Sequence, residues 1–246
     1  MRSPNIIILA AGRGSRLNKL TQKRPKALVK LNGKPIFDHL LDNLKYFNLK
    51  KITAVLGYKN NLFRKYKIKK IVNKNWKKTN MVYSLFKAYK ILNKSDSLIF
   101  YSDIIFNKNI ITILLKNTKY DITLPYNANW KKSWKKRYAK PLEDLESFKI
   151  NKKNILLEIG NKPKKYSDIN GQYMGILKIK KKGAEKMFIF YKSINKKVRE
   201  KLSMTEFLNL LLIKKILKIS VIKSKFEWHE IDTFKDLKVT KKIITV

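Results

Sequence analysis

Several residue types are missing or scarce in the 246-residue chain. Cysteine is absent, which excludes disulfides and thiolate metal sites. Acidic residues number only 17 against 58 Lys and Arg, and no Ser-His-Asp or Cys-His set accompanies the two histidines. No window has the roughly 18 unbroken apolar residues of a membrane span. The best candidate, residues 207–219, is too short and contains three lysines. The N-terminal apolar run lacks signal-peptide architecture, so we expect a cytoplasmic protein with no membrane span.

The basic excess, which gives a formal net charge of +41, is almost entirely lysine, with only seven arginines. Lysine occurs in every segment, whereas a nucleic-acid site gathers its charge on one face and favours arginine. We therefore expect a solvated lysine-rich surface and no nucleic-acid partner, and a basic nucleic-acid-binding protein is only a distant alternative. A field this positive still attracts nucleoside triphosphates and phosphorylated substrates.

The apolar pattern predicts a folded α/β protein. In the first half, buried runs alternate with amphipathic stretches, which favours a mostly parallel sheet flanked by helices. The expected strands there are 5–11, 52–56, 68–72, 97–102 and 121–125, and the expected helices are 36–47, 80–92 and 109–116. In the second half we expect paired strands at 148–151 and 155–160, strands at 173–179 and 219–224, and helices at 183–193, 204–214 and from Thr233.

A glycine loop follows the first expected strand, at residues 9–17 with the sequence LAAGRGSRL. It is not a Walker A loop, because no Gly-Lys-Ser/Thr ends it, and Leu17 replaces the third glycine of the dinucleotide fingerprint. Small residues and two glycines let backbone N–H groups approach phosphate closely. Arg13, Arg16 and Lys26 add cations that can neutralise a triphosphate. This constellation favours nucleotidyl transfer over an ordinary strand turn.

The loop and Pro25-Lys26 resemble the signature of the sugar-phosphate nucleotidyltransferase superfamily. Further motifs resemble one branch of it, the bacterial phosphocholine cytidylyltransferases and their relatives that act on phosphoglutamine or phosphonates. These motifs are Asn73, Trp76, Thr79–Leu85, Tyr101–Ile104 and Glu230–Asp232. The resemblance extends from residue 5 to about residue 238.

The resemblance implies a Rossmann-like nucleotidyltransferase fold with a smaller acceptor-binding β part. One domain would cover residues 1–246, with a nucleotide-binding half at 1–127 and an acceptor-binding half at 128–246. The implied reaction transfers CMP from CTP to a small phosphorylated or phosphonate acceptor and releases pyrophosphate. The acceptor oxygen is already ionised at neutral pH, so no general base is needed. An alternative is a sugar-1-phosphate nucleotidyltransferase that uses UTP or dTTP, and the oligomeric state is left open.

The resemblance also implies roles for individual residues. Arg16 and Lys26 would be catalytic, and Asp103 and Asp232 would hold Mg²⁺, which prefers carboxylate oxygens. Lys162, Gln172 and Tyr173 would bind the acceptor. The nucleotide would contact Leu9, Ala10, Ala11, Gly12, Arg13, Gly14, Ser15, Lys26, Gly57, Asn80 and Ser102.

Several of these residues have a structural alternative. Asp103 could be an ordinary turn or N-cap residue, and Asn80 could cap a helix instead of, or as well as, reading a ligand. Lys162 departs from the usual Glu-Lys-Pro spacing, because Asn161 precedes it. The four tryptophans (76, 130, 134 and 228) could form an aromatic box for a quaternary ammonium, but core packing is the commoner use. His39 is assigned no catalytic role.

Overall fold

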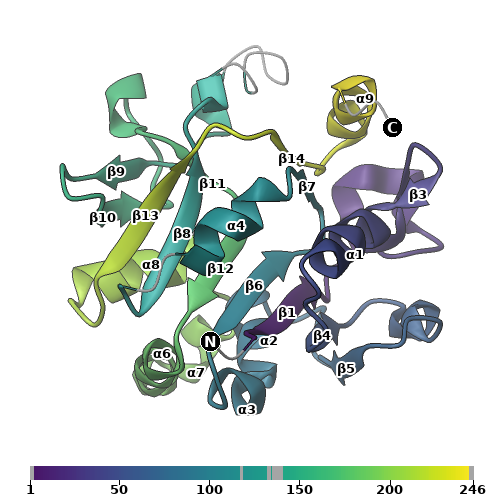
Figure 1. The fold of residues 1–246 in the computed structure, drawn as a ribbon, viewed down its shortest axis with the longest axis horizontal. Coiled ribbons are helices and arrows are strands. Elements are labelled where there is room, and N and C mark those ends of the chain that lie inside the picture. Colours follow the sequence, from purple (N-terminus) through teal and green to yellow (C-terminus); the bar gives the residue numbers. More distant parts are fainter. Residues whose placement is uncertain (1–2, 117–118, 132–133, 135–140, 244–246) are drawn as a thin grey trace.

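The structure is a computed structural model that describes residues 3–116, 119–131, 134 and 141–243. Its main sheet has eight strands in the order β11-β8-β12-β6-β1-β4-β5, with β13 also paired to β8 (Figure 1). The strands are β1 (Asn5–Ala10), β4 (Ile52–Leu56), β5 (Lys69–Val72), β6 (Ser97–Tyr101), β8 (Ile122–Asn127), β11 (Gln172–Tyr173), β12 (Ile176–Ile179) and β13 (Ile219–Ser224). Strands β1, β4, β5 and β6 pair in parallel, as do β8 and β13.

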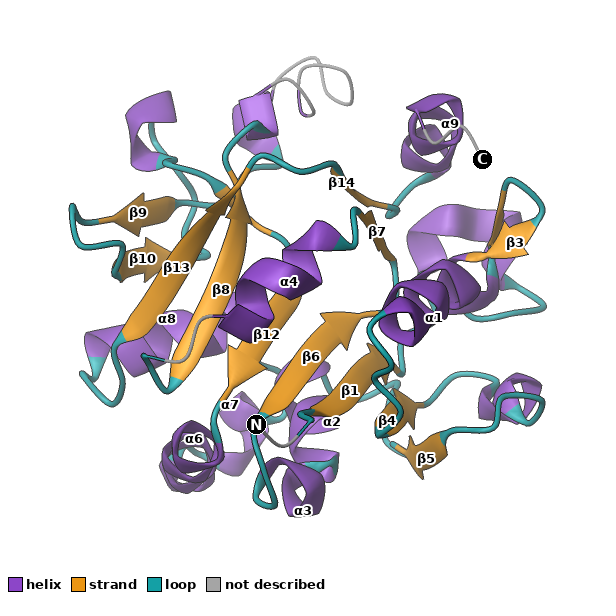
Figure 2. Ribbon diagram, in the orientation of Figure 1, coloured by secondary structure: helices purple, strands orange, loops and turns teal. Residues whose placement is uncertain are grey.

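Helices cover both faces of this sheet (Figure 2). Successive side chains of β1 point to opposite faces of the sheet, so both faces are apolar. Ile6 and Ile8 belong to one apolar cluster, and Ile7 and Leu9 belong to another. The first cluster includes side chains of α1 (Ile36–Tyr46) and α4 (Asn109–Lys116). The second includes side chains of α2 (Met81–Lys87), α3 (Tyr89–Leu92), α6 (Lys181–Ser193) and α8 (Met204–Ile213). A sheet buried on both faces accounts for the near-continuous apolar runs of its strands.

The remaining elements form small additions to this core. They are the two-stranded sheets β2 (Lys30–Leu31) with β3 (Lys34–Pro35), β9 (Phe148–Ile150) with β10 (Leu156–Ile159), and β7 (Ile104–Phe106) with β14 (Trp228–Glu230), together with helices α7 (Lys196–Arg199) and α9 (Phe234–Ile243). The β7–β14 ribbon begins directly after Asp103 and ends two residues before Asp232. It therefore joins two expected metal ligands that are 129 residues apart in the chain.

Most of the expected elements are confirmed within one or two residues, but the single helix expected at 80–92 is divided at Ala88 into α2 and α3. The single strand expected at 173–179 is wrong, because β11 and β12 are separated at Met174–Gly175. Gly175 has a φ of +69°, and a Cβ there would lie 2.8 Å from the ring of Tyr101. The ribbon strands β7 and β14 were not expected. The proposed division into halves stays a prediction, although β8 pairs with β12 and β13 inside one sheet.

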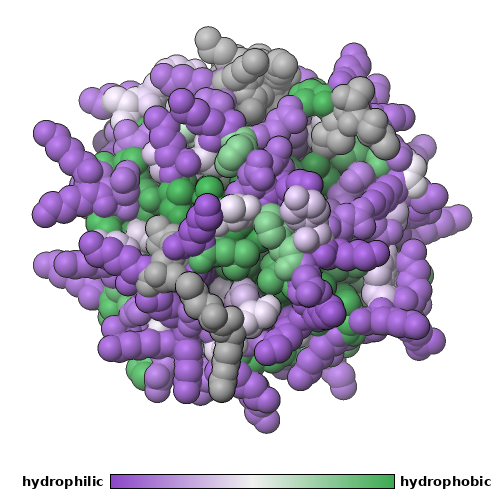
Figure 3. Space-filling view, in the orientation of Figure 1, coloured by the Kyte–Doolittle hydropathy of each residue, from purple (hydrophilic) through white to green (hydrophobic). Residues whose placement is uncertain are grey.

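Hydrophilic side chains project over the whole face drawn in Figure 3, and apolar atoms are visible mainly between them. On this face the hydrophilic side chains are thus spread around the molecule and do not form a single patch. Among the helices of the described residues, none combines the length and apolar character that crossing a membrane requires.

Candidate active site

The glycine loop leaves β1 at the carboxyl edge of the parallel strands, where open α/β sheets bind ligands. Gly14 has a φ of +75°, and a Cβ there would lie 2.5 Å from the Cβ of Lys26. Glycine is therefore required at this position for both conformation and space. Thr21 Oγ1 donates to the Gly14 carbonyl at 3.1 Å, which ties the loop to the turn that follows it. Gly12 has open space where a Cβ would be, so a ligand can approach the backbone there.

The two arginines of the loop point to different partners. Arg13 lies over the ring of Tyr58, 5.6 Å from its centroid, and Arg16 forms an ion pair with Asp232 at 2.9 Å. The Arg16 side chain remains 62% exposed. Arg16 can therefore move to an incoming anion at little cost, because an exposed ion pair contributes little.

Lys26 lies among carboxylates. Its Nζ is 2.7 Å from Asp103 Oδ2 and also forms an ion pair with Asp232 Oδ1, and the residue is buried. Burial on its own would lower the pKa of Lys26, but Asp103, Asp232 and Glu230 more than offset this and raise it above its usual value. Lys26 is therefore a permanent cation of the site.

Three carboxylates converge beside this lysine. Asp103, Glu230 and Asp232 each offer an oxygen within 4.8 Å of the others, and all three are partly buried. Oδ1 of Asp103 is buried and has no hydrogen-bond partner among the described residues. A buried carboxylate oxygen without a donor is costly unless a ligand or ion completes it.

This donor set fits Mg²⁺. A magnesium ion takes one or a few carboxylates and fills its remaining positions with water and substrate phosphates, at oxygen distances of about 2.1 Å. Oxygens that lie within 4.8 Å of one another can share one such ion. The expected convergence of Asp103 and Asp232 is found, and their role as ligands stays a prediction.

Backbone geometry explains why these carboxylates meet. Ile231 N donates to the Asp103 carbonyl at 2.9 Å, which continues the β7–β14 pairing up to both aspartates. Asp232 is then held by the start of α9, where Asp236 accepts hydrogen bonds from the N–H groups of Asp232 and Thr233, and Thr233 Oγ1 accepts one from Asp236 N. This is a capping box, and the Thr-x-x-Asp spacing predicts it from sequence.

Gly57, another expected nucleotide contact, lies where β4 ends. A Cβ at Gly57 would meet the Ala11 carbonyl and the Trp76 Cβ, each at 2.5 Å, so three segments are in close contact there. Asn73 fixes the loop that carries Trp76. It is 1% exposed, its Nδ2 donates to Thr79 Oγ1 at 3.0 Å and Ser84 Oγ at 3.1 Å, and its Oδ1 accepts from Asn75 N at 3.0 Å.

The other expected nucleotide contacts are placed as follows. Asn80 caps α2, since its Oδ1 accepts from Met81 N and its Nδ2 donates to the Lys201 carbonyl. Both of its side-chain groups are thus engaged, and reading of the base by Asn80 stays a prediction. Ser102 is buried between β6 and Asp103. Leu9, Ala10 and Ala11 are buried beside the loop, so a ligand could reach them mainly through the backbone.

Comparison with known proteins shows the family of the chain. Residues 6–156 match the family described as the MobA-like NTP transferase domain. The CTP:phosphoglutamine cytidylyltransferase of Campylobacter jejuni is 34% identical over 96% of this chain and 98% of its own length. The chain belongs to the MobA-like NTP transferase family. It is a nucleotidyltransferase, as the resemblance implied.

Two further relatives support this assignment. The choline-phosphate cytidylyltransferase of Haemophilus influenzae is 33% identical over 47% of this chain and 51% of its own. The CTP:phosphocholine cytidylyltransferase structure from Streptococcus pneumoniae superposes with a TM-score of 0.73 at 21% identity, covering 99% of this chain and all of that one. The latter likeness establishes the α/β nucleotidyltransferase fold.

The expected acceptor-binding residues of this nucleotidyltransferase lie at two places. Gln172 and Tyr173 form β11, where Gln172 Nε2 donates to the Glu146 carbonyl at 2.8 Å, and the rings of Tyr173 and Tyr101 meet edge to face at 5.7 Å. Burial and the nearby Glu230 raise the pKa values of both tyrosines. Lys162 lies on an exposed loop, and its Nζ donates to the Glu143 carbonyl. Its role toward an acceptor phosphate stays a prediction.

The tryptophans do not gather around one point as a box. Trp134 and Trp228 stack at 6.2 Å and are buried, as is Trp130, which lies beside Tyr166. Trp76 alone of the four is partly exposed, with its ring edge to face with Tyr58 at 5.2 Å. Core packing thus accounts for three of the four.

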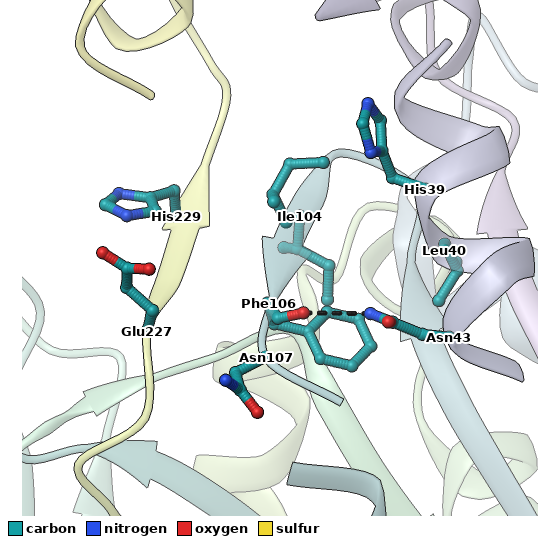
Figure 4. A pocket seen from close by; sticks show the side chains of 9 residues that line it. His39, Leu40, Asn43, Ile104, Phe106, Asn107, Glu227 and His229 are labelled. Atoms are coloured by element: carbon teal, nitrogen blue, oxygen red, sulfur yellow. Dashed lines mark hydrogen bonds between the residues drawn. The ribbon is translucent and has the colours of Figure 1, made fainter. Parts of the chain in front are cut away.

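Both histidines line a separate cavity of about 230 Å³ (Figure 4). His39 of α1 and His229 of β14 lie on opposite sides of it, with Asn43 donating to the Phe106 carbonyl at 2.9 Å and Glu227 below His229. His229 and Glu230 alternate along β14, so the cavity lies on the other side of the strand from the carboxylate cluster. Consistent with the sequence, His39 is not part of the cluster.

Glu230 is the main site residue that the sequence did not single out. Its position two residues from Asp232 was noted only as part of a motif. Because alternate strand residues share a face, the i, i+2 spacing of two acids at a strand end could have suggested a common ligand set. Asn73 was likewise noted as a motif residue, but its three side-chain hydrogen bonds depend on contacts that sequence spacing does not specify.

Proposed function

We propose that this nucleotidyltransferase is a Mg²⁺-dependent cytidylyltransferase that transfers CMP from CTP to a small phosphorylated acceptor and releases pyrophosphate. The observation that carries the proposal is the meeting of a cationic glycine loop with three carboxylates, Asp103, Glu230 and Asp232. The loop suits a triphosphate, and the carboxylates suit the metal that accompanies it.

The chemistry balances without a general base. An ionised oxygen of the acceptor phosphate attacks the α-phosphorus of CTP, one P–O bond forms, and the bond to the β-phosphate breaks so that pyrophosphate leaves. Arg16, Lys26 and the amides of the glycine loop would orient the triphosphate and stabilise its charge. Asp103, Glu230 and Asp232 would hold Mg²⁺, which when bound supplies further charge neutralisation at the phosphates.

The preference for CTP rests on relatives, since the similar proteins from C. jejuni and H. influenzae are both cytidylyltransferases. Cytosine and uracil differ at one exocyclic position, so discrimination needs a group fixed against the base. The loop held by Asn73 is suited to this, because buried hydrogen bonds restrain it beside Gly57 and Ala11. Use of UTP or dTTP with a sugar 1-phosphate is the alternative.

The acceptor is proposed to carry an ammonium group in addition to its phosphate. Glu146 lies beside Gln172, whose Nε2 donates to the Glu146 carbonyl at 2.8 Å, and Glu230 and Glu146 both raise the pKa of the neighbouring Tyr173. Negative charge and an aromatic ring are therefore close to the expected acceptor residues. Aromatic rings and carboxylates together favour ammonium groups. Two relatives are named after phosphoglutamine and choline phosphate, and both of these compounds contain an ammonium group.

A pyrophosphate-release screen tests the proposal. Four nucleoside triphosphates are paired with phosphocholine, phosphoglutamine, aminoethylphosphonate and sugar 1-phosphates, with and without Mg²⁺. We expect turnover with CTP, Mg²⁺ and an acceptor that carries an ammonium group. Preferred turnover of UTP or dTTP with a sugar 1-phosphate would support the alternative, and activity unchanged by EDTA would contradict the metal assignment.

A further inference from the structure

Lys26 pairs with two of the carboxylates that are proposed to hold the metal. Its Nζ bridges Asp103 Oδ2 and Asp232 Oδ1, two of the three carboxylates of the cluster. We propose that Lys26 is a resident counter-ion that keeps free divalent cations out of the site until the nucleotide arrives. This inference rests on the proposed function, because it concerns the order in which the metal and the nucleotide bind.

The charges of the cluster support this exclusion. Two cations pair with carboxylates of the cluster, since Lys26 pairs with Asp103 and Asp232, and Arg16 also pairs with Asp232. A free Mg²⁺ ion must therefore share Asp103 and Asp232 with Lys26 and Arg16 at short range. Like charges repel more strongly in a partly buried site than in water. Metal binding without a nucleotide should consequently be weak.

The contacts of Lys26 also link it to the glycine loop. Its backbone N–H donates to the Arg13 carbonyl at 3.1 Å, and a Cβ at Gly14 would lie within 2.9 Å of Lys26 Cβ, Cγ and Cδ. The stem of Lys26 thus lies against the loop that is proposed to bind phosphate. A bound triphosphate offers anionic oxygens to Nζ close by, so Lys26 can exchange its carboxylate partners for phosphate while the metal takes the carboxylates.

One feature argues against a purely structural ion pair. Oδ2 of Asp103 is paired with Lys26, yet its buried Oδ1 has no hydrogen-bond partner among the described residues. Buried carboxylates in structural networks normally have their oxygens satisfied. An oxygen left open beside a displaceable lysine is what a site awaiting a second cation requires.

The test measures binding of Mn²⁺, a spin-active substitute for Mg²⁺, by electron paramagnetic resonance of the free ion. We expect wild-type protein to bind Mn²⁺ weakly alone and much more tightly with a non-hydrolysable CTP analogue. Lys26→Met should bind Mn²⁺ alone at least about tenfold more tightly than wild type, because the competing cation is gone. Lys23→Met removes an exposed lysine three residues away and should behave as wild type.

The outcomes separate the inference from the proposed function. Wild-type protein that binds Mn²⁺ alone as tightly as with the analogue would overturn the inference, as would a Lys26→Met variant that still needs the analogue. No Mn²⁺ binding even with the analogue would overturn the proposed function instead. Lys26→Gln serves if Lys26→Met does not fold. As a second readout, MgCl₂ without nucleotide should raise the melting temperature of the lysine variant and leave that of wild type unchanged.

Discussion

The two halves of the chain differ in how they distribute charge. Basic residues are spread evenly, with 27 in residues 1–127 and 31 in residues 128–246, whereas only five of the 17 acidic residues lie in the first half. The site follows this division. The first half provides Arg13, Arg16, Lys26 and one carboxylate, Asp103, and the second provides the carboxylates of Glu230 and Asp232. The cations of the site thus come from the first half, and two of its three carboxylates come from the second.

The halves also hold their site residues differently. In the first, the glycine loop and Asp103 follow the ends of parallel strands β1 and β6, so the sheet itself positions them. In the second, Asp232 depends on a ribbon of three-residue strands and a helix cap. Glu146 depends on hydrogen bonds that its side chain accepts from Thr205 Oγ1 and its carbonyl accepts from Gln172 Nε2. Substitutions in the first half should therefore change nucleotide parameters, and those near Glu146 should change acceptor parameters alone.

The largest effect is expected where the halves meet. Asp103→Asn removes a charge and a ligand oxygen, and should lower kcat by about 10³-fold or more in a pyrophosphate-release assay at any practical Mg²⁺ concentration. Asp232→Asn should cost as much or slightly less. Asp42→Asn, at an exposed surface acid paired with Lys34, is the matched control and should have no effect. Substantial activity in Asp103→Asn would contradict the shared metal site.

The next largest losses of activity are expected from substitution of the loop cations Arg16 and Lys26. Arg16→Ala and Lys26→Ala should each lower kcat by about 10²-fold, because both remove charge stabilisation of the triphosphate. Their stabilities should differ. Lys26→Ala leaves partly buried carboxylates without their partner and should lose about 2 kcal/mol or more of unfolding free energy, whereas exposed Arg16 should cost little. Thermal melting and turnover of the two variants, measured together, test this contrast.

The difference between residues positioned by the sheet and residues positioned by distant contacts also explains how much of the structure the sequence could predict. Strands such as Ile52–Leu56 and Ile219–Ser224 were predicted to the residue, because buried apolar runs bounded by polar residues are local signals. Asp103 was predicted as a site residue because it ends such a strand beside a recognisable glycine loop. The fold and the nucleotide side of the site were accordingly accessible from local pattern and resemblance.

What the sequence could not predict depends on non-local contacts. The break between β11 and β12 comes from packing of Gly175 against Tyr101, and the β7–β14 ribbon pairs segments more than 120 residues apart. The pairing of Lys26 with two aspartates also needs that ribbon in place. Short strands of three residues have too little periodicity to be recognised alone.

A moderate effect is expected at Asn73, which tests whether the loop it holds discriminates bases. Asn73→Ala removes three side-chain hydrogen bonds and should raise KM for CTP by about tenfold, reduce the preference for CTP over UTP, and leave KM for the acceptor unchanged. Asn75→Ala, at an exposed position in the same loop, is the control. Equal loss of kcat with both nucleotides and no change in KM would point to a structural role only.

The smallest effect, at Glu146, tests the acceptor side. Burial raises the pKa of this carboxyl, with Glu206 and Asp144 adding to the shift and a hydrogen bond from Thr205 opposing it. Glu146→Gln should raise KM for an amine-bearing acceptor by about fivefold and leave KM for CTP unchanged, because it removes a negative charge near Tyr173 but not the group that accepts from Thr205. Exposed Glu143→Gln is the control.

Glu146→Gln should weaken acceptor binding but increase stability at high pH. The increase follows from the raised pKa of Glu146 in the folded protein. A carboxyl whose pKa is higher in the folded state than in the unfolded state binds more protons when folded, so wild-type stability falls as pH rises through that range. Glutamine does not titrate, so Glu146→Gln should melt about 2 °C higher than wild type at pH 8, and this gain should disappear near pH 4. If the variant is more stable at pH 8 but has a higher KM for the acceptor, Glu146 is retained for acceptor binding and not for stability. A variant that is less stable at pH 8 with unchanged acceptor KM would mean that Glu146 serves the fold alone.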